Sequence, residues 1–154
     1  MTTPEIAFGD LQAGDAFDLG EVTVTAQEIV AFARAYDPQP FHLDADVAAD
    51  SPYGGLIASG WQTCGLFMRA FATGFLNRTL SLGSPGIDQL RWKAPVRPDD
   101  RLTARYEVVS VRVSASKPDR GIVVGHGSLA HPERGEVLHL TATNLLGRGT
   151  GGTA

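Results

Sequence analysis

Residues 59–77 read Ser-Gly-Trp-Gln-Thr-Cys-Gly-Leu-Phe-Met-Arg-Ala-Phe-Ala-Thr-Gly-Phe-Leu-Asn, and this segment decides the fold class. Apolar side chains recur on nearly every side of a helix drawn through it, and a helix without a broad polar face is usually buried. Ser59 is a suitable N-cap, because its hydroxyl can accept a hydrogen bond from the first turn. We therefore predict a buried helix from Gly60 to about Asn77, with small residues that let a sheet approach closely.

The sequence after this helix predicts strands. Segments with strand-like composition, separated by turns rich in Pro, Gly and Asp, cover residues 86–93, 101–115, 121–130 and 136–146. Their succession predicts an antiparallel meander. In the second segment the apolar alternation changes phase between Val108 and Val109, which indicates a bulge or a bend in mid-strand. A bent sheet is suited to curve around a helix.

The part of the chain before residue 59 carries mainly helix signals. A short strand is expected at 22–25. Thr25 and Glu28 have the spacing of a capping box, which opens a helix that Pro38 must end near Asp37. Asp44 can cap a short helical turn that runs through residue 48.

One buried helix enclosed by a long, curved antiparallel sheet is the α+β arrangement known as the hotdog fold. The chain has 154 residues, 43% of them hydrophobic, which suffices for one core. We therefore predict a single domain over residues 1–146 and a disordered tail over 147–154, where Gly and Thr dominate. The edge of such a sheet needs cover, most simply by a second copy, so we expect at least a homodimer.

Composition excludes several functional classes. The formal net charge is −4 and no block of Lys and Arg is present, so nucleic acid is not an expected partner. The single cysteine, Cys64, cannot form an internal disulfide. No segment has the uninterrupted apolar length of a membrane span, and residues 1–10 lack the pattern of a secretion signal. We therefore expect no membrane association and a cytoplasmic location.

The stretch Asp37-Pro-Gln-Pro-Phe-His42 carries the chemistry. Two prolines within four residues restrict the backbone, so we expect a stiff and largely extended segment that displays Asp37 and His42. A carboxylate and an imidazole can exchange protons near neutral pH and can hold one water molecule between them. The alternative is that Asp37 only ends a helix and His42 packs in the core.

This stretch resembles the signature of the MaoC-like dehydratases and (R)-specific enoyl-CoA hydratases, which runs Asp, any residue, Asn, Pro, an apolar residue, His. Asp37, Pro40, Phe41 and His42 are in register with it. Residues 54–61 are similar to the start of that family's central helix, and residues 89–102 to its strand, turn and strand. The resemblance extends from about residue 14 to 146. It implies a hotdog fold and the reversible addition of water to a trans-2-enoyl thioester, which gives a 3-hydroxyacyl thioester.

The resemblance also implies roles for individual residues. Asp37 and His42 correspond to the pair that orients and activates the water, and they are expected to act as one titrating unit. The backbone N–H of Gly60, at the amino end of the helix, would polarise the thioester carbonyl. The alternative is that Gly60 is small only because packing there tolerates no side chain. No metal or other cofactor is implied, since coenzyme A enters as part of the substrate.

Three residues depart from the family pattern. Gln39 stands where Asn is usual, Ser59 where well-known hydratases have His, and Met68 where some of them have Ser. We expect Gln39 and Ser59 to bind the substrate, and Trp61 and Tyr53 to line an acyl pocket.

Basic residues around one strand and turn form a second candidate site for the substrate. These residues are Arg91, Lys93, Arg97 and Arg101, of which Arg91 and Arg97 are the expected contacts for the phosphates of coenzyme A. A solvated basic patch is the alternative. The acyl chain, and the choice between coenzyme A and a carrier protein, stay open.

Three other functions are possible. A hotdog thioesterase would hydrolyse the same class of substrate, although the loop with two prolines and His42 favours hydration. A non-catalytic subunit could bind the acyl thioester. Finally, His42 and Asp44 with His126, His131 or His139 have the pattern of an iron-binding triad, but that pattern belongs with an all-β barrel.

Overall fold

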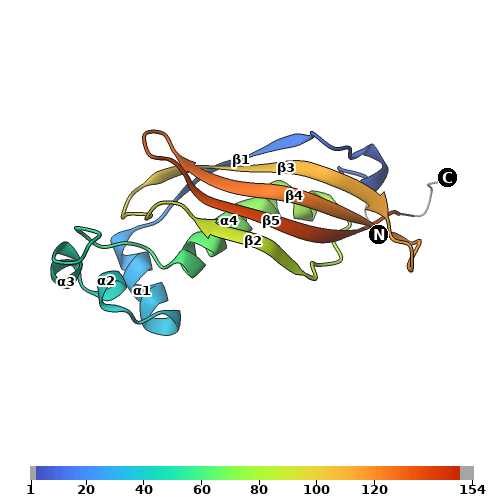
Figure 1. Ribbon diagram of the computed structural model, residues 1–154. Helices are drawn as coiled ribbons and strands as arrows, with labels where there is room; N and C mark the ends of the chain where they lie inside the picture. The colour runs from blue at the N-terminus through green and yellow to red at the C-terminus, as the bar shows by residue number, and fades with distance from the viewer. Residues whose placement is uncertain (1–2, 150–154) are drawn as a thin grey trace.

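The computed structural model describes residues 3–149, in which one sheet packs against the long helix α4, Gly60–Gly74 (Figure 1). The sheet consists of β1 (Ala16–Thr23), β2 (Gly86–Trp92), β3 (Arg101–Val113), β4 (Arg120–His131) and β5 (Gly135–Gly147). Its order is β1-β3-β4-β5-β2, and all pairs are antiparallel. Three shorter helices lie together beyond one end of the sheet: α1 (Ala26–Tyr36), α2 (Pro40–Leu43) and α3 (Ala45–Ala49).

The predicted buried helix is confirmed as α4. The Ser59 hydroxyl accepts a hydrogen bond from Trp61 N–H, which makes it the N-cap, as expected. Leu66, Phe67, Ala70 and Phe71 are buried on the side that faces the sheet, and the Phe71 ring centroid lies 4.5 Å from that of Tyr106 on β3. The helix ends at Gly74, before the predicted end, because the backbone at residue 75 leaves the helical region. A 3-10 turn, Leu76–Arg78, then follows.

The four predicted strands are confirmed, but their arrangement as a simple meander is wrong. Only β3, β4 and β5 are consecutive neighbours; β2 pairs with β5, and β1 pairs with β3. β2 and β3 therefore lie three strand spacings apart, or roughly 15 Å. The segment 93–100 can reach up to about 26 Å, so the chain can cross the end of the sheet there. The alternation of apolar and polar residues within a strand does not indicate which other strand it pairs with.

The predicted bulge in the longest strand segment is also confirmed. The pairing of β3 with β4 shifts register between Val108 and Ser110. β1 is longer than the segment expected at 22–25: it begins at Ala16 and contains its own register shift between Asp18 and Gly20. These irregularities bend the sheet over α4.

Glycines on β4 let aromatic side chains approach the sheet. A Cβ atom at Gly127 would lie 2.2 Å from the Phe67 ring, and one at Gly125 would lie 2.3 Å from the ring of Tyr106. At Gly127 the helix side chain Phe67 can thus lie on β4, and at Gly125 the Tyr106 ring of β3 can lie over the neighbouring strand. These two positions require glycine for packing, not for backbone conformation.

Replacing Gly127 by Ala should destabilise the protein by about 1–3 kcal/mol, because the new methyl group must displace the buried Phe67 ring. Urea unfolding measures this loss. The matched control is Gly65→Ala in α4, where a Cβ atom meets nothing within 4 Å. That change should stabilise the helix by about 0.5–1 kcal/mol. Equal unfolding midpoints for the two variants would contradict this account of the packing.

The helices before residue 59 begin where the capping signals predict. Thr25 Oγ1 accepts from Glu28 N–H, and the Glu28 carboxylate accepts from Thr25 N–H, so the capping box is complete. Asp44 accepts from the N–H groups of Asp46 and Val47 and caps α3, as expected. The expectation of an extended segment up to His42 is wrong, since α2 begins at Pro40. Proline is well suited to the first position of a helix, where its missing N–H is not needed.

The end of the sheet extends past the predicted domain boundary at residue 146. Gly147 is the last residue of β5 and donates to Leu80 O, and Arg148 N–H donates to Asp119 O. Residues 150–154 of the predicted tail lie outside the described residues. Within residues 3–149, no helix combines the length and the apolar character needed to cross a membrane.

Candidate active site

Asp37 and His42 meet where the helices converge beside the start of α4. Asp37 ends α1, and His42 lies in the single turn of α2. His42 Nε2 lies 3.2 Å from Asp37 Oδ2. The helical turn from Pro40 turns the chain back, and in this way the structure brings together the two residues that the sequence singles out.

The His42 ring is fixed by a backbone carbonyl. Its Nδ1 donates to the oxygen of Ile57 at 2.7 Å, and the residue is only 4% exposed. A carbonyl oxygen can only accept, so Nδ1 carries a hydrogen. Nε2 is therefore the ring nitrogen that is free to exchange a proton, and it faces the Asp37 carboxylate.

Asp37 is held by side chains on both of its oxygens. The Ser59 hydroxyl donates to Oδ2 at 2.7 Å, and Gln39 Nε2 donates to Oδ1 at 2.7 Å. Burial by itself would raise the pKa of Asp37, but the hydrogen bonds from Gln39 and Ser59 and the nearby His42 together lower it below its usual value. The carboxylate is consequently ionised at neutral pH and available to a water molecule as an acceptor.

Ser59 has a different role from the one predicted. Its side chain is fully buried, so it cannot contact a substrate, and the prediction of direct substrate binding is wrong. The hydroxyl instead donates to Asp37 and accepts from Trp61 N–H. One buried hydroxyl thus caps α4 and fixes the carboxylate. Gln39 similarly braces Asp37, but it is exposed and lines the pocket.

Gly60 lies at the start of α4 and lines the pocket. Its N–H has no hydrogen-bond partner among residues 3–149, and its proposed contact with a thioester oxygen stays a prediction. A Cβ atom at this position would also lie 2.4 Å from the Trp92 ring. The indole nitrogen of Trp92 donates to Gly60 O at 2.9 Å. The glycine therefore leaves the N–H uncovered and lets the indole pack on the helix start.

These groups open onto one pocket with a volume of about 460 Å³. Polar groups of Asp37, Gln39 and His42 stand at one wall, with Gly60 beside them. Trp61 and Tyr53 both line it, as predicted. Much of the remaining wall is apolar and comes from Phe41, Ile57, Ala58, Trp92, Pro95 and Val96. Such a pocket fits an apolar ligand that carries one polar reacting centre.

Comparison with known proteins shows the family of this chain. Residues 10–126 match the family described as MaoC like domain, which is more than half of the chain. The chain belongs to this family. The crystal structure of the MaoC-like dehydratase from Rhodospirillum rubrum superposes with a TM-score of 0.85 at 38% identity, covering 94% of this chain and 99% of that one. The predicted α+β hotdog fold is thereby confirmed.

Two curated relatives carry names that describe a reaction. The 3-hydroxyacyl-thioester dehydratase Z of Mycobacterium tuberculosis (strain H37Rv) is 33% identical over 107 residues, which is 66% of this chain and 71% of the relative. The (R)-specific enoyl-CoA hydratase of Rhodospirillum rubrum is 27% identical over 139 residues, which is 83% of this chain and 93% of the relative. Members of the MaoC-like family that resemble this chain are thus named for adding or removing water.

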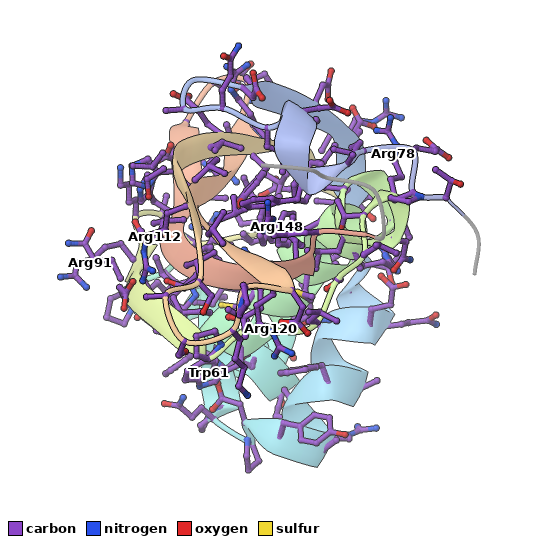
Figure 2. The ribbon with its side chains drawn as sticks, turned by 90° about the vertical axis from the view of Figure 1, so that its right-hand side faces the viewer. Trp61, Arg78, Arg91, Arg112, Arg120 and Arg148 are labelled. Carbon is purple, nitrogen blue, oxygen red and sulfur yellow. The ribbon has the colours of Figure 1, made fainter. Side chains whose placement is uncertain are left out.

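The basic residues predicted for coenzyme A each have a different position or partner in this MaoC-like domain, and their binding to phosphate stays a prediction. Arg91 lies on the outer face of β2 and projects away from the body of the protein (Figure 2). Arg97 lies near the pocket rim, where its guanidinium donates to Tyr53 O at 2.6 Å. Lys93 lines the pocket but is paired with Glu136. Arg101 begins β3 and lies 3.6 Å from Glu21.

The iron-triad alternative is not supported by the positions of its ligands. The Asp44 carboxylate is occupied as the cap of α3. His126 hydrogen-bonds to Thr141, and its ring centroid lies 5.0 Å from that of His139 on the neighbouring strand. Over residues 3–149, no three His, Cys, Asp or Glu side chains are grouped as metal ligands.

Two components of the site were not predicted from the sequence. The carbonyl of Ile57 orients His42, but a backbone atom leaves no signal in residue type. Trp92 covers Gly60 from a strand 32 residues later. Its position inside the strand-turn-strand motif is the only signal that could have indicated it.

Replacing Ser59 by Ala should raise the pKa of Asp37 towards its usual value, because one of the hydrogen bonds that lower it is lost. Because the pKa of Asp37 is lower in the folded protein than in the unfolded chain, where it is about 3.9, the ionised carboxylate stabilises the fold at a pH above 3.9. This stabilisation disappears as the pH falls through the pKa of the folded protein. Loss of the Ser59 cap should cost about 1 kcal/mol of stability at both pH 7 and pH 3. The variant should lose additional stability at pH 7, where the Asp37 carboxylate is ionised. Carboxyl NMR titration and urea unfolding at both pH values measure this. An unchanged titration of Asp37 would contradict the assignment.

Proposed function

We propose that this protein catalyses the reversible addition of water to a trans-2-enoyl thioester, giving a 3-hydroxyacyl thioester. The observation that carries this proposal is the Asp37–His42 pair: an ionised carboxylate lies 3.2 Å from the one ring nitrogen that can exchange a proton, at the wall of a largely apolar pocket. Membership of the MaoC-like family and the names of its relatives support the reaction class.

In the proposed hydration, one water molecule is bound by both the Asp37 carboxylate and His42 Nε2. Its oxygen forms a bond to C3 of the enoyl group as the C2=C3 π bond breaks. One proton passes from the water to the Asp37–His42 pair, and the pair delivers a proton to C2. The two residues act as a unit, so base and acid are not assigned separately. Proton transfer of this kind contributes about 10²- to 10⁴-fold in rate.

The second contribution in this proposal is charge stabilisation at the thioester oxygen. Negative charge develops on that oxygen as water adds, and the N–H of Gly60 at the start of α4, which has no partner within residues 3–149, would donate a hydrogen bond to it. One such donor is commonly worth about 10²- to 10³-fold in rate. Acid–base transfer and one oriented N–H need no metal or organic cofactor, and we propose that coenzyme A, or a carrier, enters only as part of the substrate.

The proposal is tested with crotonyl-CoA, by following loss of the enoyl absorbance and release of free thiol in the same sample. We expect the absorbance to fall to an equilibrium value without thiol release. The reverse reaction, from 3-hydroxybutyryl-CoA, should reach the same equilibrium. Thiol release with the conjugated enoyl group intact would contradict the proposal and identify a thioesterase.

We further propose that the protein is a homodimer or a higher homo-oligomer. The sheet has unpaired outer edges on β1 and β2, and apolar side chains beside β2 are unusually exposed: Trp61 59%, Ile87 52% and Met68 49%. Exposed apolar groups next to a free strand edge favour pairing with a second copy. Light scattering should give a mass of at least twice 16.3 kDa. A mass of 16.3 kDa at micromolar concentration would contradict this.

A further inference from the structure

A second pocket, of about 410 Å³, lies further along α4, between this helix and β2. Its walls are mainly apolar and include Phe67, Met68, Phe71, Ile87, Leu140 and Ala142. Polar side chains, such as Asn144, enter its lining beyond Ala142 on β5. The proposed hydration makes no use of this pocket, because neither Asp37 nor His42 lines it.

The two pockets lie at different levels of α4, and α4 and β2 run in opposite directions past each other. Trp92, at the end of β2, contacts Gly60 at the start of α4, whereas Ile87 near the beginning of β2 shares the second pocket with Met68 and Phe71. On β5, Leu138 pairs with Trp92 and Ala142 pairs with Ile87. The first pocket therefore precedes the second along the same helix and the same strands.

The Trp92 indole lies on the start of α4 and belongs to the wall of the first pocket. The ring lines that pocket, packs on Gly60, and lies edge-on to Trp61 with 5.3 Å between ring centroids. Cys64, one helical turn beyond Gly60, belongs to the lining of the second pocket. Among the described residues, none lines both pockets, so the two pockets are separate, and Trp92 lines the first of them on Gly60, one helical turn before Cys64.

We propose that Trp92 terminates the acyl-chain site and restricts the substrate to short enoyl chains. This inference rests on the proposed function. An acyl chain attached to the reacting carbons must extend along the apolar part of the pocket, and the indole blocks the way towards Cys64. With a smaller residue at position 92, the chain would continue into the second pocket, whose walls suit methylene groups. Each newly buried methylene is worth on the order of fourfold in binding.

The test compares kcat/KM for crotonyl-CoA, trans-2-octenoyl-CoA and trans-2-dodecenoyl-CoA between the wild type and Trp92→Leu. The wild type should prefer crotonyl-CoA. In Trp92→Leu, the ratio of octenoyl to crotonyl turnover should rise by roughly tenfold or more, which corresponds to about two newly buried methylene groups. Trp92→Phe keeps an aromatic ring on Gly60 and provides a second variant if Trp92→Leu does not fold. It should give a smaller rise in the same direction.

Refilling the second pocket provides the matched control. Ala142 lines that pocket on the β5 side, so Ala142→Leu added to Trp92→Leu should abolish the gain for octenoyl-CoA and leave crotonyl-CoA turnover close to that of Trp92→Leu alone. Calorimetric binding of butyryl-CoA and octanoyl-CoA, which cannot be hydrated, reports the same preference without catalysis. Light scattering checks that all variants keep the mass of the wild type.

The outcomes of this comparison distinguish an error in the inference about Trp92 from an error in the proposed function. If the wild type hydrates all three chains equally well, or if folded Trp92 variants keep the wild-type chain-length preference in both turnover and binding, Trp92 is not the limit and the inference is wrong, while the proposed function stands. If the wild type hydrates none of the thioesters, the proposed function is wrong and the inference falls with it.

Discussion

Replacing Asp37 by Asn is expected to lower kcat/KM for enoyl-thioester hydration by about 10³-fold. The amide cannot carry the negative charge that holds the water and takes part in proton transfer. Its shape is nearly that of the carboxylate, and its oxygen can still accept from Ser59. Gln39 can turn its own amide to accept from the new NH₂ group. Activity should therefore be lost without loss of the fold, as measured by steady-state kinetics with crotonyl-CoA and by thermal unfolding.

Asp44→Asn is the matched control for this substitution. Asp44 lies seven residues from Asp37 in the same region, but its carboxylate caps α3 and does not line the pocket. Asparagine is nearly as good an N-cap as aspartate, so activity should stay within a factor of two or so of the wild type. If Asp37→Asn keeps the turnover of Asp44→Asn, the Asp37 carboxylate has no catalytic role.

Replacing His42 by Asn should also lower kcat/KM by about 10³-fold, because Nε2 is lost. The Asn amide nitrogen can take the place of Nδ1 and keep donating to Ile57 O. Replacement by Ala, in contrast, leaves that carbonyl without its donor, at a further cost of about 1–3 kcal/mol in stability. Comparing the two variants by kinetics and urea unfolding separates the loss of proton transfer from the loss of the structural hydrogen bond.

His139→Asn serves as the control for the histidine substitutions. His139 lies on β5, pairs with Glu136 and does not line the pocket, so activity should not change. In the double variant of Asp37 and His42, the loss should be close to that of the more damaging single variant, since residues that act as one unit are not additive. Turnover that survives both single changes would exclude this loop as the catalytic site and favour a non-catalytic thioester-binding subunit.

Most of the elements could be predicted from the sequence because their signals are local. The capping box joins Thr25 and Glu28, which are three positions apart, and the Ser59 cap acts on the turn that follows it. The bulge after Val108 is visible as a change in alternation within one strand. Each signal depends on backbone geometry and hydrogen bonds over a few residues, which neighbouring side chains largely determine.

The part of the site that lies in one stretch of sequence could also be predicted. Asp37 and His42 are five residues apart, and their pairing needs only the single turn that begins at Pro40. The error in that stretch, an extended segment in place of a helical turn, arose because two closely spaced prolines suggest an extended chain, although Pro40 is also suited to the first position of a helix.

By itself, the sequence determined a buried helix, a set of antiparallel strands and an acid–base pair on a stiff turn, since each depends on contacts between residues close in the chain. Only the tertiary structure decided that β2 lies beside β5, that Ser59 supports Asp37 across 22 residues, and that Trp92 covers Gly60 across 32. Such contacts form when separately encoded elements pack. Residue type at either end does not specify them, because many partners of similar size and polarity could fill the same space.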